Sequence, residues 1–341
     1  MKYNQPEYYK NFSCKGGDCR HTCCHGWGIT LSMNEYYRLL GLECEPSLRR
    51  RLDTAFYPLD TPSEERFAMV NLRYDGDCPL HAEDGLCELH RQKGEGKIPS
   101  VCRMYPRSVR GNGCCCTDSC EAVIERLSEL GGILTFDASE MEYPANGEDD
   151  SQATVAAFEA IEYISDTAFP LPVRIYNYGK VIGVTVADFK LPPYEAMKRI
   201  SDTLISGSDA VEEYVSPSVY AVYDESGAEK RYPEAVEALE NEFPDVGRLL
   251  ANILINHIFY DRFELYKMTP ENRFDVLCLL YALMRITVAG FVLTAKGKED
   301  KNGLVDCIAG LFRYVEHSNF DENAPRLLKK YSVIPSDLLA F

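Results

Sequence analysis

The chain has little positive charge and a single tryptophan. Its 341 residues include 36 lysines and arginines against 53 aspartates and glutamates, which gives a formal net charge of −17. Proteins that bind a nucleic-acid backbone carry basic patches, so the charge argues against a nucleic-acid partner. It fits a protein partner that presents lysine side chains, although an acidic surface also serves solubility alone.

The chain also lacks the apolar segments that mark secreted and membrane proteins. Its start, MKYNQPEYYKNF, is polar and aromatic and has no small-residue cleavage site, so we expect no signal peptide. No uninterrupted apolar run reaches about 18 residues, the length that favours a membrane-spanning helix. We therefore expect a cytoplasmic protein with no membrane partner.

Cysteine, by contrast, is abundant and clustered. Twelve of the fourteen cysteines fall within the first 120 residues. The other two, Cys278 and Cys307, lie in apolar helical runs and are expected in the core. Clustered cysteines form disulfides in secreted proteins and bind metals or do redox work inside cells. A chain this long has a large core and little need of disulfides, so metal binding is favoured.

The cysteine spacing fits a metal site. Short loops let two thiolates converge on one ion, and glycines inside such loops let the backbone fold back toward the sulfur atoms. Gly16 and Gly17 lie in the loop between Cys14 and Cys19, and Gly85 lies in the loop between Cys78 and Cys87. Thiolates select zinc or iron–sulfur clusters, and the pattern does not distinguish the two. Eight thiols could form two four-ligand sites, or one site with bystanders.

Other residues near these cysteines have plainer interpretations. Side chains at neighbouring positions diverge, so Cys23 and Cys24 are not expected to bind the same ion together. Cys114, Cys115 and Cys116 would alternate faces on a strand and are expected as small buried residues. The nearby histidines are not needed as ligands, and Trp27 would serve as an apolar lid over the metal or as ordinary core.

Composition divides the chain into three regions. We expect a cysteine-cluster metal-binding domain over residues 1–127, a linker over 128–152 and a mostly helical domain over 153–341. The fold class is mainly α, that is, α+β with little sheet. A helix capped by Ser32 or Asn34 is expected early in the chain, and the β-branched and aromatic stretch at 173–189 is typical of a hairpin.

Four blocks resemble a known family, the flagellin lysine-N-methylases (FliB-like), which overlap the zinc- or iron-chelating cysteine-cluster proteins. The blocks are YYKNFSCKGGDCRHTCCHGWGITLS, CPLHAEDGLCELH, VCRMYPRSV and DSCEAVIERL. The resemblance covers about residues 3–127; beyond the linker, only a helical region of similar size is shared. It implies a cytoplasmic enzyme that uses S-adenosylmethionine to methylate flagellin lysines. It also implies a bound iron–sulfur cluster (4Fe-4S, with zinc as the alternative) and the metal ligands Cys14, Cys19, Cys23, Cys24, Cys78, Cys87, Cys102 and Cys120.

The residues themselves support only part of that picture. No glycine-rich nucleotide-binding turn and no Cys-x3-Cys-x2-Cys run of radical enzymes is present, and no catalytic base can be named. S-adenosylmethionine carries a carboxylate and an adenine ring, so its pocket needs an arginine and an aromatic wall. Arg103, Tyr105 and Arg107 are therefore expected to border that pocket, unless the arginines only neutralise thiolates. The alternative function is a non-catalytic protein that carries metal or senses redox state.

Overall fold

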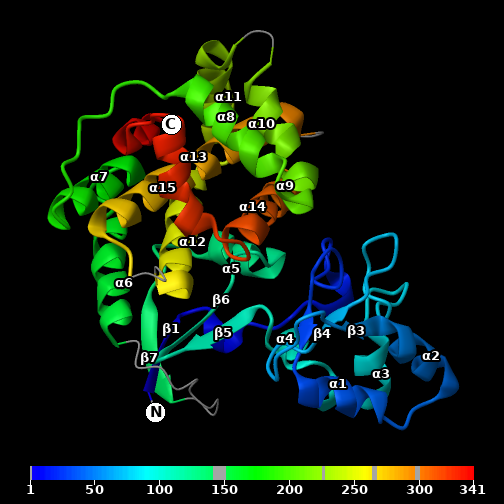
Figure 1. The fold of residues 1–341 in the computed structure, drawn as a ribbon. Helices are drawn as coiled ribbons and strands as arrows, with labels where there is room; N and C mark the ends of the chain where they lie inside the picture. Colours follow the sequence, from blue (N-terminus) through cyan, green and yellow to red (C-terminus); the bar gives the residue numbers. More distant parts are fainter. Residues whose placement is uncertain (1, 141–150, 225–226, 263–266, 296–299) are drawn as a thin grey trace. The chain divides into compact units, whose positions relative to one another are not determined.

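The computed structural model describes residues 2–140, 151–224, 227–262, 267–295 and 300–341. The described chain is mainly helical with two small sheets, as the sequence predicted. It forms two compact units (Figure 1): a cysteine unit, Ser13–Pro106, and a helical unit, Met1–Phe12 with Arg107–Phe341. The expected linker at 128–152 contains residues 141–150, which lie outside the described residues.

Helices make up most of the helical unit. In the described residues beyond 150 every regular element is helical. They are α6 (Ser151–Ile164), α7 (Leu171–Val181), α8 (Tyr194–Ile205), α9 (Asp209–Tyr214), α10 (Ser216–Val222), α11 (Ala228–Glu242), α12 (Val246–Asp261), α13 (Pro270–Thr294), α14 (Lys301–Val315), α15 (Phe320–Lys330) and η5 (Pro335–Ala340), preceded by α5 (Glu121–Glu129) and η1 (Tyr9–Asn11).

Helix α13 is the core of this unit. It packs against α7, α10, α11, α14, α15 and η5, and a helix that is apolar all round is a buried one. It is also long and apolar enough to cross a membrane, which corrects the sequence-based statement that the chain has no such segment. In its most apolar 18-residue window, 89% of the residues are buried inside the protein, as expected for a core helix.

The prediction of a hairpin at 173–189 is wrong, because the first half of this stretch belongs to helix α7. Leu171, Ile175 and Tyr178 are buried at a spacing of three to four residues, which places them on one face of a helix. Pro172 in the first turn adds a residue that favours a helix start. This spacing outweighs the strand preference of the β-branched residues, because that preference depends on context.

The sheet of the helical unit joins distant parts of the chain. Its strand order is β5 (Arg107–Arg110), β6 (Gly113–Cys116), β1 (Lys2–Pro6) and β7 (Phe136–Glu140). Strand β1 is parallel to β6, with Asn4 opposite Gly113, and antiparallel to β7. Strand β6 is buried along its whole length, so Cys114, Cys115 and Cys116 are small core residues, as predicted.

The cysteine unit has short elements around a small core. Its helices are α1 (Met33–Leu40), α2 (Pro46–Ala55), α3 (Glu88–Lys93) and α4 (Ser100–Met104), with η2 (Gly16–Asp18) and η3 (Glu95–Lys97). A three-stranded antiparallel sheet has the order β2 (Thr30–Leu31), β4 (Ala68–Val70), β3 (Phe56–Pro58). Ser32 caps α1 together with Glu35, which confirms the predicted helix start.

Candidate metal centre and acidic cleft

The thiols of the cysteine unit lie close enough to interact. Cys23 and Cys24 hydrogen-bond through their side chains, and the Cys24 carbonyl oxygen accepts a 2.8 Å hydrogen bond from the Cys78 amide. The sequence predicted that the side chains of Cys23 and Cys24 diverge. They converge because the segment is a turn, in which the His25 amide lies 3.3 Å from the Thr22 carbonyl oxygen.

Burial and mutual repulsion both disfavour the ionised form of these thiols. Burial raises the pKa of Cys78 to about 12, with a further contribution from neighbouring Cys24 and Cys87. It also raises the pKa of Cys102, where the same neighbours add to the effect. A bound metal would offset this repulsion, because metals bind the thiolate form. Such interactions link six of the eight predicted ligands: Cys14, Cys23, Cys24, Cys78, Cys87 and Cys102.

Backbone amides surround two of the sulfur atoms. The amides of Leu80 and His81 hydrogen-bond to the thiol of Cys78, and those of Leu89 and His90 do the same for Cys87. Hydrogen bonds of this kind stabilise negative charge on sulfur and hold thiolate ligands in position around a metal.

Two glycines let the cysteine-bearing loops touch. A Cβ atom at Gly85 would lie 2.8 Å from the Gly17 carbonyl oxygen, and one at Gly17 would lie 2.6 Å from the Asp84 carbonyl oxygen. Real Cβ atoms do not approach other atoms so closely. The loop that carries Cys14 and Cys19 and the loop that follows Cys78 can meet only where both chains have glycine.

Asp77 organises a polar group beside the thiols. Its carboxylate lies 2.7 Å from His25 Nδ1 and 2.9 Å from His81 Nδ1, and it pairs with Arg73. His81 Nε2 is buried with no hydrogen-bond partner in the described structure. The hydrogen bond from Cys23 lowers the pKa of Cys24, and His81 lowers it further. A histidine held by a carboxylate through one nitrogen is the usual arrangement of a metal ligand, although the sequence gave His81 little weight.

The remaining predicted residues are more dispersed. Cys19 lies in the cysteine unit, whereas Cys120 lies in the helical unit at the start of α5. Tyr105 packs against Trp27 with ring centroids 5.8 Å apart. Arg107 donates a 3.0 Å hydrogen bond to the Phe12 carbonyl oxygen and lies over the Phe12 ring. Arg103 is in the last turn of α4.

The sequence did not reveal a second group of residues, which lies in the helical unit. A cleft of about 830 Å³ opens beside the ends of α12, α14 and α15. Burial, and then the charge of Asp321, with which it shares a hydrogen bond, raise the pKa of Asp261. The acidic residues that line the cleft are Asp261, Asp275, Glu316, Asp321 and Glu322; the basic ones are Lys267, Arg326 and Lys329.

His257 lies beside this carboxyl pair. Two groups of described residues have three metal-ligating atoms within 4.8 Å of one another, and both include His257: one with Asp261 and Asp321, the other with Asp118 and Glu316. Neither group contains a cysteine. His257 and Asp261 are four residues apart and share one face of α12, but Asp118, Glu316 and Asp321 are distant from them in the sequence, so local spacing could have indicated only the first pair.

A comparison with protein-family models finds a match within the helical unit. Residues 185–333 match the family model described as the FliB lysine N-methylase C-terminal domain. The resemblance to the lysine N-methylases is confirmed. The match lies beyond residue 152, where the sequence analysis expected the resemblance to fade, and that expectation is wrong. The matched segment contains His257 and the cleft residues Asp261, Glu316 and Asp321.

Individual relatives are similar over shorter stretches. Proteins named lysine-N-methylase from Salmonella choleraesuis and Salmonella typhimurium are each 28% identical over 105 residues, which is 30% of this chain and 26% of theirs. The flagellar biosynthetic protein FliU of Salmonella muenchen is 27% identical over 105 residues, 61% of its length. The alignment thus spans about a quarter of the first two relatives. No solved structure matches the chain.

Proposed function

We propose that the chain is an S-adenosylmethionine-dependent protein lysine N-methyltransferase of the cytoplasm, acting on flagellin. The observation that carries the proposal is the match of residues 185–333 to a lysine N-methylase domain, because the acidic cleft is built largely from that segment. The relatives are named as lysine-N-methylases and a flagellar protein, which supports a flagellar substrate.

The cleft suits a cationic substrate. A lysine ammonium group entering it meets five carboxyl groups against three basic side chains. Lysine must lose a proton before its nitrogen can attack a methyl group, so the enzyme needs a proton acceptor near that nitrogen. Asp261 and Asp321 share a hydrogen bond, and burial raises the pKa of Asp261, which makes its carboxylate a stronger base than an exposed one.

The same cleft can hold the methyl donor. S-adenosylmethionine supplies an electrophilic methyl group on a cationic sulfonium. Arg326, Lys267 and Lys329 can pair with its carboxylate, and the cleft volume lies in the range of small-molecule sites. The block with Arg103, Tyr105 and Arg107 is the alternative contact, although Arg107 already holds Phe12.

The cysteine unit fits a metal centre, which we propose to be a 4Fe-4S cluster, with zinc as the alternative. Crowded thiols, amides directed at Cys78 and Cys87, and the carboxylate-held His81 are a donor set for a soft metal. Cys24, Cys78, Cys87 and Cys102 are the central candidates, and His81 is a further one. Bound metal would order the loops of this small unit.

Methyl transfer to flagellin tests the proposal. Protein purified without oxygen, incubated with flagellin and S-adenosylmethionine, should yield methyl-lysine by mass spectrometry. Asp261→Asn should lower the rate by about 100-fold or more, the usual contribution of a general base, while Glu237→Gln, which changes an exposed carboxyl on α11 outside the cleft, should change it little. If the parent protein holds metal but transfers no methyl group, the non-catalytic alternative replaces the proposal.

Calorimetry locates the methyl donor. One charge-assisted pair contributes about 1.5–3 kcal/mol, or roughly tenfold or more in affinity. Arg326→Met should therefore weaken S-adenosylmethionine binding by about tenfold, with Arg107→Met as the matched variant. If only Arg107→Met weakens binding, the donor lies at the block that contains Arg103, Tyr105 and Arg107.

A further inference from the structure

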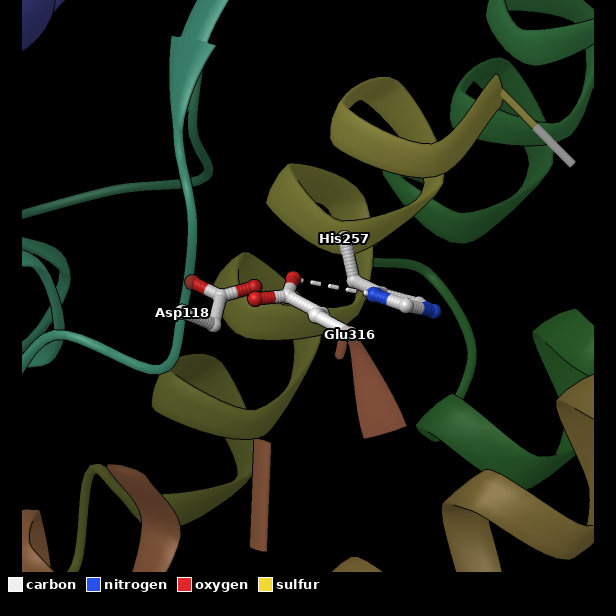
Figure 2. Close-up of side chains that lie close together, drawn as sticks. All are labelled: Asp118, His257 and Glu316. Carbon is white, nitrogen blue, oxygen red and sulfur yellow. Dashed lines mark hydrogen bonds and ion pairs between the residues drawn. The ribbon is translucent and has the colours of Figure 1, made fainter. Parts of the chain in front are cut away.

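Behind the cleft lies a buried group of two carboxyls and an imidazole. Asp118 lies between β6 and α5, His257 on α12 and Glu316 at the end of α14. Figure 2 shows the carboxyl groups of Asp118 and Glu316 facing each other, with His257 joined to Glu316. Asp118 has no exposed surface, and the side chains of His257 and Glu316 are 4% and 0% exposed.

Each of the two carboxyl groups is held in place through its other oxygen. Asn256 donates a 2.9 Å hydrogen bond to Asp118 Oδ1. Glu316 Oε2 accepts hydrogen bonds from the Thr117 hydroxyl and, at 3.2 Å, from the Ser119 amide. These donors leave Asp118 Oδ2 and Glu316 Oε1 as the oxygens that face the group. Outer contacts of this kind orient the ligands in metal sites.

One atom of the group has no partner. Asp118 Oδ2 is buried and makes no hydrogen bond within the described structure. Burial raises the pKa of Asp118, and the charge of Glu316 raises it further. Two buried carboxyls this close need a compensating positive charge, which is either a proton or a cation.

The spacing fits a cation. His257 Nδ1 and Glu316 Oε1 are 3.1 Å apart, at hydrogen-bond distance. Two adjacent ligands on an octahedral ion at about 2.1 Å lie about 3.0 Å apart, so an ion could replace this hydrogen bond with little movement of either group. The ligand atoms of all three residues lie within 4.8 Å of one another. Glu316 also lines the cleft, although its side chain has no exposed surface, so the group lies directly behind the cleft wall.

We propose that Asp118, His257 and Glu316 bind one divalent transition-metal ion, such as Mn²⁺ or Fe²⁺. Carboxylates and imidazole are the donors these ions accept, whereas the thiols of the cysteine unit select softer metals. The ion would tie together three segments that are distant in the sequence, at the inner end of the cleft. The site is separate from the cysteine centre and does not depend on the methyltransferase proposal.

Titration with Mn²⁺ tests this site on the full chain with its cysteine centre intact. Electron paramagnetic resonance should show one equivalent of Mn²⁺ bound at sub-millimolar concentration, with nitrogen modulation from His257 in pulsed spectra. Asp118→Asn and Glu316→Gln should each weaken binding by about 100-fold. Asp275→Asn, which removes a cleft carboxyl outside the group, should leave the affinity within about twofold.

The outcomes distinguish a bound cation from a proton shared by the two buried carboxyl groups. If the parent protein binds no Mn²⁺, the proposal is overturned. It is also overturned if Asp275→Asn weakens Mn²⁺ binding as much as Asp118→Asn and Glu316→Gln do, because that would indicate only a general attraction of the ion to acidic surface. Should the Asp118 and Glu316 variants fail to fold, the parent protein still decides: bound Mn²⁺ without nitrogen modulation excludes His257 as a ligand. Metal content of the cysteine centre, measured in every variant, should stay unchanged.

Discussion

At the scale of single residues, cysteines of one unit differ in what surrounds them. The thiols of Cys24, Cys78 and Cys87 lie close enough to Cys102 to raise its pKa. Cys44 packs against the same apolar core as Cys102. Cys102→Ser should therefore lower metal content and solubility together, since metal binding and folding are coupled. Cys44→Ser should keep the metal. Elemental analysis of both variants checks this, and full occupancy in Cys102→Ser removes it from the ligand set.

Asp275 makes stability depend on pH in a predictable direction. Burial, with help from Glu271, raises its pKa to about 6, above the value near 3.9 of an unfolded chain. The unfolded state therefore releases this proton first as pH rises, so the contribution of Asp275 to stability is full below about pH 4 and is lost by pH 6 to 7.

The variant Asp275→Asn should remove that loss. At pH 8 it should stabilise the protein by about 1 to 1.5 kcal/mol, allowing for partial exposure, and the gain should shrink toward pH 4. Thermal unfolding followed by circular dichroism at pH 5 and pH 8 measures it, with Glu322→Gln as the control. An equal gain at both pH values would mean that ionisation of Asp275 is not the cause.

The sequence indicated candidate functional residues only where those residues are close together along the chain. The cysteine motifs pointed to a metal because short loops impose closeness. Asp261 and Asp321, or Asp118 and Glu316, are brought together by helix packing over 60 to 198 intervening steps of chain, and nothing local marks them. Cys120 starts a helix in the helical unit, and its place among the metal ligands stays a prediction.

At the scale of elements, the contact between the two cysteine loops can be tested with a pair of glycines. Gly85 and Gly94 have nearly the same backbone angle, φ +79° and +80°, so alanine costs about 1–2 kcal/mol of backbone strain at either position. Only at Gly85 would the new Cβ atom strike the Gly17 backbone; at Gly94 nothing lies within 4 Å.

Gly85→Ala should therefore lose more stability than Gly94→Ala and should also lose metal, because it pushes apart the loops that carry the thiols. Thermal unfolding and elemental analysis of the two variants give the comparison. Equal losses would show that backbone strain alone matters and that the loop contact does not hold the metal centre.

The elements themselves were largely predictable. Apolar residues at helical spacing indicated most of the helices after residue 150, and Ser32 marked the start of α1. The failure at 173–189 came from composition: β-branched residues favour strands only when a sheet is there to pair with them. Strand β1 lies ahead of the cysteine unit but pairs with β6 and β7 after it, which no local pattern predicts.

At the scale of the whole molecule, the two units differ in what holds them together. The helical unit has an extended apolar core around α12, α13 and α14, whereas the core of the cysteine unit is small and is bordered by the thiols themselves. A unit with so small a core is marginal on hydrophobic burial alone. Metal bound by its thiols would supply much of its folding free energy.

Removal of that metal should therefore unfold one unit and spare the other. Hydrogen exchange followed by mass spectrometry can be measured on the protein before and after chelation. The protection factors of amides in α2 and β4 should fall by at least about tenfold, because a loss of even 1.4 kcal/mol changes an opening equilibrium tenfold. Amides in α12 and α13 should change by less than about twofold, because their protection rests on buried apolar packing. Equal loss in both units would show that the chain unfolds as a single cooperative body. Unchanged protection in the cysteine unit would show that its small core suffices without metal.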